Sequence, residues 1–474
     1  MSQARLIQSR SDLKSVLLLA LPVLGEQFLE FLVGMVDTWL AGNFLPPERT
    51  VPAMAAIGLV SYSIWMLFVI FSSVGIGATA VVARLFGAEQ EDEANRAANQ
   101  AVLLGLLASL VATFLLWQFS DAFVSLLQLE GDAHELASQY LRIVVPSVPA
   151  FMMISVGVAC LHGAGDTVSG LVVMAVVNVL NASISAALTI GWGPLPELGW
   201  IGLAIGTAVS HVVGGLLIAL LLARGQAGIR LTMQNLRPDP RMMRRVLRIG
   251  LPAGLNEVML LIFHLWYLGI INSMGTLSAA AHGLGVKMES PAYLAAWAFS
   301  ISAATLTGQH LGANNPLRAK RATGISLLIC GGMLTIYMLV LLAASAPMTQ
   351  FFLPPSSEAL DMQSTATLAA NLLKIVALGF PFLALYAVVN GALRGAGDTT
   401  WPLVVTLIGF LLVRIPGAYY LAWETIPIPL TGWEIEGLGW GVTGAWIAMV
   451  ADQILRASLL GARYLSGQWQ HVKV

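Results

Sequence analysis

The sequence predicts an all-α polytopic membrane protein with twelve transmembrane helices in two parallel-repeat six-helix lobes. Three observations predict this fold. Of the 474 residues, 57% are hydrophobic and only 10% are charged, whereas soluble domains carry about 25% charged residues. Apolar segments long enough to cross about 30 Å of hydrocarbon recur along the whole chain. Short motifs also repeat between the two halves. The net charge of -1 gives no indication of nucleic-acid binding.

The predicted spans share an apolar composition and a length of roughly 20 residues or more. The first six lie near 16–41, 53–83, 97–119, 137–161, 167–192 and 199–223, and the second six near 246–272, 276–309, 322–346, 366–393, 400–423 and 438–463. Several are longer than a straight span requires, so tilted or kinked helices are expected. Prolines inside the spans should bend them: Pro22, Pro146, Pro149, Pro252, Pro291, Pro381 and Pro416.

The distribution of basic residues predicts the orientation. Eighteen of the 24 Lys and Arg residues lie in, or within three residues of, the terminal segments and the loops that follow even-numbered spans. Because cytoplasmic loops carry the excess of basic residues, both termini are expected in the cytoplasm of a multi-pass protein of the cell (inner or plasma) membrane. The predicted organisation is an N-terminal lobe over 1–225, a basic cytoplasmic linker over 226–245 and a C-terminal lobe over 246–474.

Internal similarity indicates a duplication. The segment His162–Thr167 (HGAGDT) recurs as Arg394–Thr399 (RGAGDT), 232 residues later. In these turns the glycines are expected to permit a tight reversal, and the aspartates to cap the next helix. Since six spans is an even number, both halves insert the same way round, and a substrate is expected between the two lobes.

Three carboxylates lie on one face of the first span. Spacings of four and seven place Glu26, Glu30 and Asp37 within roughly 40° of arc on a helix. An ionised acid near the bilayer centre costs about 2.5 kcal/mol or more, so such acids usually face a cavity and mark an ion or substrate path. The alternative is neutralisation by basic residues of neighbouring helices.

Polar residues of spans five and six could complete a site around Asp37. A buried carboxylate can bind and release a proton near neutral pH. Together with amide and hydroxyl oxygens, it could instead ligate a hard cation such as sodium. The candidates are Asn178, Asn181, Ser185 and Thr207. Interhelical hydrogen bonding is the alternative role for each of them.

The second half lacks an equivalent acidic stripe. Span seven carries Glu257 and His264, but Tyr267 occupies the position that matches Asp37. The two lobes are therefore expected to differ in function.

Two ion pairs are predicted in the second half. Lys287 and Glu289 in span eight are expected to form one, and Asp452 and Arg456 in span twelve another. The sequence contains no P-loop and no GxSxG, HExxH or CxxC motif, so an enzyme or an ATP-driven pump is not expected.

Four segments resemble the multidrug and toxic compound extrusion (MATE) family, and the resemblance extends over essentially all twelve spans. They are Ala280–Ala313, Arg414–Ala422, Leu393–Pro402, and Gly34–Gly42 preceded by Leu21-Pro22. The resemblance implies a cation-coupled efflux antiporter that exports amphipathic organic cations or drugs, in other words xenobiotic transport. The coupling ion is H⁺ or Na⁺, no cofactor is implied, and a monomer in contact with membrane lipid is expected.

By position, Asp37 matches the family's first-helix aspartate, Asn181 its fifth-helix asparagine and Thr207 its sixth-helix threonine. Many members carry a second aspartate where this chain has Ser185, and NorM-branch members carry an acid where it has Leu383. The chain therefore looks nearer the DinF-like branch, and proton coupling at Asp37 is the preferred mechanism. Glu30 and Glu26 are added as a proton path or as replacements for the missing acid.

The remaining polar residues of the spans are candidates for lining the substrate cavity: Gln27, Asn178, Ser185, Glu257, His264 and His282. Three other functions are considered. A lipid-linked precursor flippase of the same superfamily would need a strongly cationic cavity. A major-facilitator transporter would carry a basic Gly-Arg-rich motif after span two, where this chain has Arg84–Ala94. An intramembrane enzyme would need a catalytic dyad, for which Glu257 with His264 is the only hint.

Overall fold

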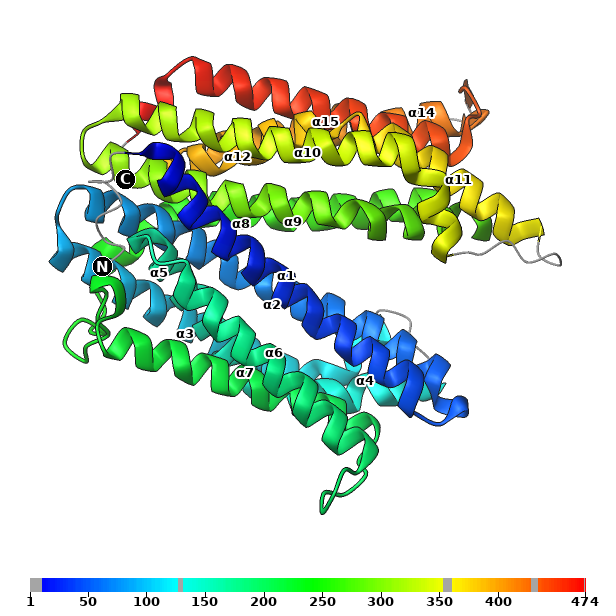
Figure 1. Cartoon of the computed structure of the whole chain (residues 1–474), viewed down its shortest axis with the longest axis horizontal. Coiled ribbons are helices and arrows are strands. Elements are labelled where there is room, and N and C mark those ends of the chain that lie inside the picture. Colours follow the sequence, from blue (N-terminus) through cyan, green and yellow to red (C-terminus); the bar gives the residue numbers. More distant parts are fainter. Residues whose placement is uncertain (1–10, 127–130, 353–359, 428–433, 473) are drawn as a thin grey trace. The chain divides into compact units, whose positions relative to one another are not determined.

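The computed structural model describes residues 11–126, 131–352, 360–427, 434–472 and 474, and these are almost entirely helical (Figure 1). In the first half of the chain the elements are α1 (Asp12–Phe44), α2 (Pro47–Gly87), α3 (Glu91–Leu126), α4 (Gly131–Val144), η2 (Val145–Ser147), α5 (Val148–Ala164), α6 (Val168–Ile190), α7 (Trp200–Ala223) and η3 (Gln226–Gly228). In the second half they are α8 (Pro240–Asn272), α9 (Thr276–Gly312), α10 (Pro316–Phe352), α11 (Leu360–Ala377), α12 (Phe380–Ala396), α13 (Thr400–Ile408), η4 (Gly409–Arg414), α14 (Ile415–Ala422), β1 (Thr425–Pro427), β2 (Glu434–Glu436), α15 (Gly441–Leu465) and η5 (Gln468–His471). The two short strands pair antiparallel, with Ile426 opposite Ile435.

Each of the twelve predicted spans coincides with one helix or with a run of consecutive helices. Among the described residues, ten helices are long and apolar enough to cross a membrane, and α11 with α12 forms one further broken span. The remaining span is α9, which is 37 residues long. Its sequence includes His282, Lys287 and Glu289, which lower its mean hydropathy. The prediction of an all-α fold with twelve spans is confirmed.

Prolines interrupt three of the spans. The 3₁₀ turn η2 contains Pro146 and separates α4 from α5. The α11–α12 pair bends by 51° just before Pro381. The π-helical turn η4 ends just before Pro416, whose missing N–H cannot continue the helical hydrogen-bond ladder. Pro22 and Pro291, by contrast, lie inside continuous helices.

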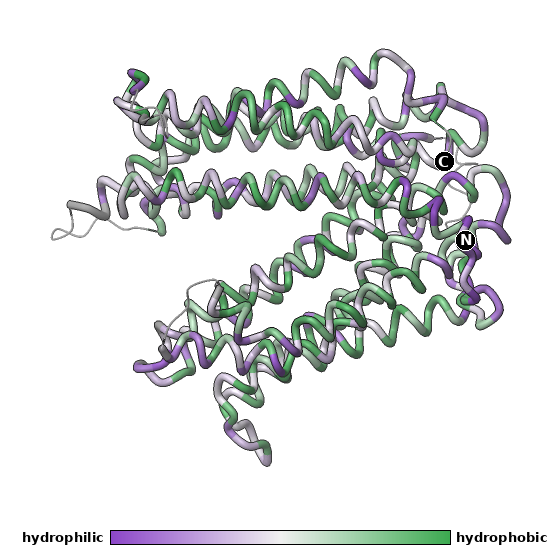
Figure 2. Tube along the Cα trace, turned by 180° about the vertical axis from the view of Figure 1, so that it is seen from behind, coloured by the Kyte–Doolittle hydropathy of each residue, from purple (hydrophilic) through white to green (hydrophobic). Residues whose placement is uncertain are grey.

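The chain forms two compact units. The first contains Met1–Gly254, Gly308–Pro316 and Val474, and the second contains Leu255–Thr307 and Leu317–Lys473. The division into lobes at 226–245 stays a prediction. In both units hydrophobic residues follow the lengths of the helices, whereas hydrophilic ones gather in loops near the helix ends (Figure 2).

Within the first unit, α6 packs along both α1 and α7 (Figure 1). A cluster of buried apolar residues in this unit is built mainly from α2, α3 and α5. In the second unit α15 packs against α12 and α14. These contacts hold α1 and α15, the helices that carry the buried charges described below, against several neighbours each.

The repeated turns have the same geometry in both units. Gly165 ends α5 and Gly397 ends α12 in the left-handed region, with φ of 89° and 86°. The N–H of Asp166 donates to the carbonyl of Leu161 at 2.9 Å, which closes the Schellman-type turn. The carboxylate of Asp166 then accepts from the N–H of Ser169 at 3.0 Å, so the predicted capping of α6 is confirmed.

Replacing Gly165 with alanine is expected to destabilise the protein by about 1–2 kcal/mol, because a Cβ is disfavoured in the left-handed region. Thermal unfolding in detergent measures the effect as a lowered Tm. Gly324→Ala is the matched control, since nothing lies within 4 Å of its added Cβ in α10. That control should be stabilising by about 0.5–1 kcal/mol. An unchanged Tm for the Gly165 variant would contradict the argument.

Candidate coupling and substrate sites

Asp37 lies in the C-terminal third of α1, on the side that packs against α6 and α7. Only 6% of the residue is exposed. A carboxylate at this depth needs hydrogen-bond donors around it, because burial without them would strongly disfavour its charge.

Three side chains from three other helices donate to the Asp37 carboxylate. Thr207 Oγ1 of α7 lies 2.8 Å from Oδ2, and the hydroxyl of Tyr140 from α4 lies 3.0 Å from the same oxygen. Asn181 Nδ2 of α6 lies 3.4 Å from Oδ1. Thr207 Oγ1 also accepts from Tyr140 at 3.0 Å and from Asn181 at 3.1 Å. The structure therefore brings the predicted residues Asp37, Asn181 and Thr207 together in one network.

Ser185 of α6 is the residue at which the family resemblance leads one to expect a second aspartate. It is fully buried, and its Oγ lies 3.4 Å from Asn181 Nδ2. Within the described part of the chain, the Asn181 Oδ1 atom is buried without a hydrogen-bond partner. This network can hold a proton on Asp37. Its unpartnered amide oxygen is also of the type that ligates a hard cation.

Glu30 and Gln27 form a separate group on α1. Gln27 Nε2 donates to Glu30 Oε2 at 3.4 Å, and Glu30 is exposed although it lies in a membrane-length helix. A rise of 1.5 Å per residue puts Glu30 about 10 Å from Asp37 along the helix axis. Among the described residues, no hydrogen bond joins Glu30 to Asp37.

Glu26 is the third acid of the stripe, and it has its own partner. Its Oε2 lies 3.2 Å from Nε2 of His162 in the last turn of α5, and the two residues are 7% and 4% exposed. Gly170 of α6 makes room for the carboxylate, because a Cβ at that position would lie 2.5 Å from Glu26 Oε2. One stripe on α1 therefore contributes to three separate clusters.

The other candidates for the substrate cavity have local partners. Asn178 donates to the backbone carbonyl of Met174 at 2.9 Å, and the ring of His264 hydrogen-bonds to the carbonyl of Leu260. Both contacts lie within a single helix, α6 for Asn178 and α8 for His264, and not between helices as the alternative for Asn178 supposed.

Glu257 and His282 make contacts with more distant residues. Glu257 pairs with Arg394 of α12. His282 Nδ1 accepts from Trp446 Nε1 at 3.1 Å.

The second unit contains a buried cluster of charges. Asp452 is fully buried, and its carboxylate lies 2.9 Å from Arg456 and 3.8 Å from Arg414. The Arg414 guanidinium also stacks over the ring of Tyr267, the residue that matches Asp37 in the repeat, at 4.5 Å. The predicted Asp452–Arg456 pair is confirmed.

The predicted Lys287–Glu289 pair is wrong. Because these residues are two apart on a helix, their side chains point in directions about 160° apart. Lys287 is exposed, whereas Glu289 is buried with its Oε2 unpartnered.

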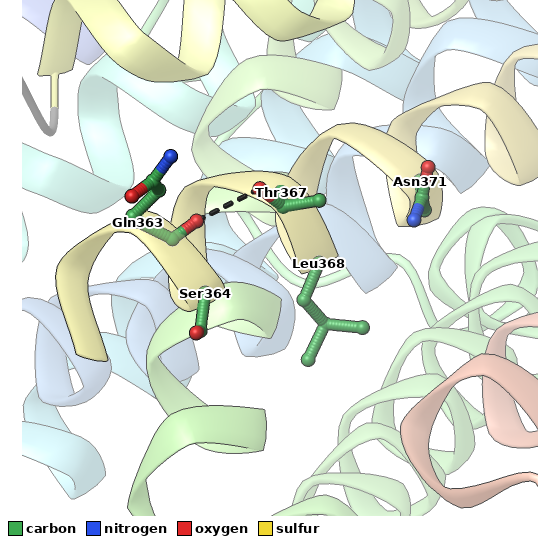
Figure 3. Close-up of a pocket in the computed structure, with 5 residues that line it drawn as sticks. All are labelled: Gln363, Ser364, Thr367, Leu368 and Asn371. Carbon is green, nitrogen blue, oxygen red and sulfur yellow. Dashed lines mark hydrogen bonds between the residues drawn. The ribbon is translucent and has the colours of Figure 1, made fainter. Parts of the chain in front are cut away.

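A further polar surface lies on α11 and was not predicted (Figure 3). An open hollow of about 400 Å³ is lined by Gln363, Ser364, Thr367, Leu368 and Asn371. Thr367 Oγ1 also donates to the carbonyl of Gln363 at 2.8 Å. The spacing of these polar residues over two turns of helix was the available signal. Its recognition was hindered because the predicted span began only at 366.

Two residues that contact the predicted acids were also missed. Tyr140 was a lone tyrosine inside an apolar span, and His162 was interpreted only as part of a turn motif. No pattern of consecutive residues indicates that α4 and the end of α5 pack against α1 near these acids.

A helical bundle of membrane-crossing length with a hydrogen-bonded carboxylate buried among four of its helices is characteristic of a multi-pass membrane transporter. The chain belongs to the MatE family, whose model matches residues 22–186 and 252–420. The predicted MATE resemblance is thus confirmed, and the chain is a transporter rather than an enzyme. Placement near the DinF-like branch stays a prediction.

Two relatives extend over nearly the whole chain. The probable multidrug resistance protein NorM of Thermotoga maritima is 28% identical over 463 residues, which cover 96% of this chain and 93% of the relative. The probable multidrug resistance protein NorM of Mannheimia succiniciproducens is 26% identical over 467 residues, covering 97% and 95%.

Solved structures have the same fold. A crystal structure described as MATE in complex with MaL6 matches with a TM-score of 0.86 at 18% identity, over 100% of both chains. An outward-facing multidrug resistance MATE family transporter of the MOP superfamily matches with a TM-score of 0.85 at 19% identity, over 100% of this chain and 99% of that one. A MOP superfamily transporter from Pyrococcus furiosus, whose description reports a binding pocket of reversed polarity, has a TM-score of 0.86 at 18% identity, over 100% and 99%.

Proposed function

We propose that this chain is a proton-coupled efflux antiporter that exports amphipathic organic cations, including drugs, across the cell membrane, with both termini in the cytoplasm. The observation that carries the proposal is the network around Asp37, in which one buried carboxylate accepts hydrogen bonds from α4, α6 and α7. The names of the NorM relatives support multidrug resistance as the physiological context.

Protonation of Asp37 would change this network directly. An ionised carboxylate is a pure acceptor and suits the three donors around it, whereas a protonated one carries a donor of its own. With Thr207 and Tyr140 both directed at Oδ2, a proton on that oxygen displaces at least one of them. Binding a proton from outside therefore loosens α1 from its neighbours. Release of that proton to the cytoplasm restores the contacts.

This exchange couples the proton to the substrate. When α1 moves, the outward-open site changes shape and the organic cation leaves. The exposed Glu30 and its partner Gln27 supply a negative and a polar group on the same helix, which suits a cationic substrate. Sodium is the alternative coupling ion, with Asp37, Asn181 and Thr207 as oxygen ligands.

The flippase alternative is less well supported. It requires several unpaired bases in a cavity to hold a pyrophosphate group. In the described part of the second unit, Arg394 is paired with Glu257, and Arg414 and Arg456 lie beside Asp452.

Efflux of a fluorescent organic cation from proteoliposomes tests the proposal under a pH gradient alone and a sodium gradient alone. A pH gradient should suffice to drive transport. Transport driven only by the sodium gradient would show that sodium, and not the proton, is the coupling ion. Transport driven by neither gradient would contradict the antiport mechanism.

Tyr140→Phe is expected to reduce proton-driven efflux about tenfold, since a hydrogen bond to a charged group contributes about 1.5–3 kcal/mol. The variant keeps the ring, which packs against Trp200 at 5.4 Å. The matched control is Tyr337→Phe in the second unit, whose hydroxyl donates to the carbonyl of Met288 and whose ring stacks on Phe380. Equal losses in both variants would show that Tyr140 acts only in packing.

A further inference from the structure

Each unit joins its first long helix to a residue just before the repeated Gly-Ala-Gly-Asp turn by an acid–base pair. In the first unit Glu26 of α1 contacts His162 of α5 at 3.2 Å. In the second unit Glu257 of α8 contacts Arg394 of α12. His162 and Arg394 are the first residues of the two copies of the motif, whereas Glu257 stands one position beyond Asn256, the residue that matches Glu26 in the repeat.

The two pairs differ in one chemical property. Arginine stays charged in proteins, so the Glu257–Arg394 pair can only hold helices together. Histidine gains and loses a proton near physiological pH. A pair that served only to fix α1 would be satisfied by arginine, as it is in the second unit. The first unit instead has the one base that can exchange a proton.

The Glu26–His162 pair lies deep in the first unit. Both residues are more than nine-tenths buried, and Gly170 of α6 closes over the carboxylate. The nearest acid along α1 is Glu30, one turn away. Beyond the turn, Asp166 is engaged by Ser169 at 2.6 Å and by Gln226 at 2.8 Å.

The pair also lies on the route that a proton would take from Asp37. It is eleven residues, about 16 Å, closer to the beginning of α1, the end that the basic residues predict to be cytoplasmic. The exposed Glu30 lies between the two on the same face. The order of groups along α1 is therefore Asp37, Glu30, and the Glu26–His162 pair.

We propose that Glu26 and His162 form a second proton-binding site, which takes up the proton that Asp37 releases and passes it to the cytoplasm. This inference rests on the proposed proton coupling at Asp37. The Asp37 carboxyl group loses its proton through water and Glu30, the imidazole of His162 gains it, and the resulting imidazolium loses it to cytoplasmic water. Asp37 and His162 each return to their starting state, and one proton has crossed the unit.

The first test measures transport while the pH on the cytoplasmic side is varied at a constant pH difference. Wild-type efflux should change about fivefold or more across pH 6 to 8, a size typical of coupling between two sites. His162→Arg restores the arrangement of the second unit without an exchangeable proton, and its efflux should be slower and vary less than about twofold. A wild-type profile in this variant would overturn the proposal.

Glu26→Gln separates the exchange of protons from the packing of α1. It removes the acid, and transport should lose its dependence on cytoplasmic pH as it does in His162→Arg. If Glu26→Gln fails to fold, His162→Arg still decides the question, because it keeps a base beside Glu26.

The second test counts protons without any transport. Purified protein is titrated between pH 8 and 5, and the uptake of His162→Arg is subtracted from that of the wild type. The site predicts a difference of about one proton per molecule. A difference near zero would overturn the second site. If transport itself ignores proton gradients, the proposed function fails while this titration still reports on the pair.

Discussion

Replacing Asp37 with asparagine is expected to abolish proton-driven efflux, with a loss of at least about a hundredfold. Asparagine has the same shape but binds no proton in the physiological range, so the network around it has only one state. Its amide also offers one acceptor atom where the carboxylate offers two, so either the Thr207 and Tyr140 hydroxyls or Asn181 Nδ2 would face a donor in place of an acceptor. Efflux of a fluorescent cation under an imposed pH gradient measures the loss.

Asp132→Asn is the matched control, because Asp132 is an exposed aspartate in the first turn of α4. It should transport like the wild type. Binding of the cation to the purified Asp37 variant should persist, which separates lost coupling from lost substrate recognition. Undiminished proton-driven efflux in the Asp37→Asn variant would contradict the proposed mechanism.

Replacing Asp452 with asparagine is expected to destabilise the second unit by about 3–5 kcal/mol, the usual cost of breaking a buried ion pair from one side. Asp452 is fully buried between Arg456 at 2.9 Å and Arg414 at 3.8 Å. Without its carboxylate, two buried guanidinium groups lose their negative neighbour. Thermal unfolding in detergent should show a much lower Tm and a lower yield of folded protein.

The control is Glu93→Gln, which breaks an exposed pair between Glu93 and Arg96 with side chains 42% and 55% exposed. Surface pairs contribute about 0–1 kcal/mol, so this variant should unfold close to the wild-type temperature. Equal Tm values for the two variants would contradict the importance of burial for the Asp452 cluster.

Helical spacing predicted that Glu26, Glu30 and Asp37 share a face of one helix, and they do. Helical spacing could not predict that each acid would belong to a different cluster. The partners of Glu26 and Asp37 depend on which neighbouring helix contacts each part of α1. Likewise, Tyr140 and His162 lie 103 and 136 residues beyond their partners in the chain, and no local pattern connects residues so far apart.

Spacing along the chain predicted an ion pair correctly where both partners lie on one helix and on the same side of it. Asp452 and Arg456 stand four residues apart on one helix and pair as predicted. Lys287 and Glu289 stand two apart and do not, because the helix directs them to opposite sides. The polar surface on α11 was not predicted, because the side chains that line it are exposed at the end of a predicted span.

The sequence by itself determined the twelve spans, the duplication and the shared face of Glu26, Glu30 and Asp37, because hydrophobic length, repeated motifs and helical period are properties of consecutive residues. Tertiary structure alone decided which donors surround Asp37, which base contacts Glu26 and which charged residues of the second unit lie together. These contacts join helices that are distant in sequence, and only the packing of those helices sets their distances.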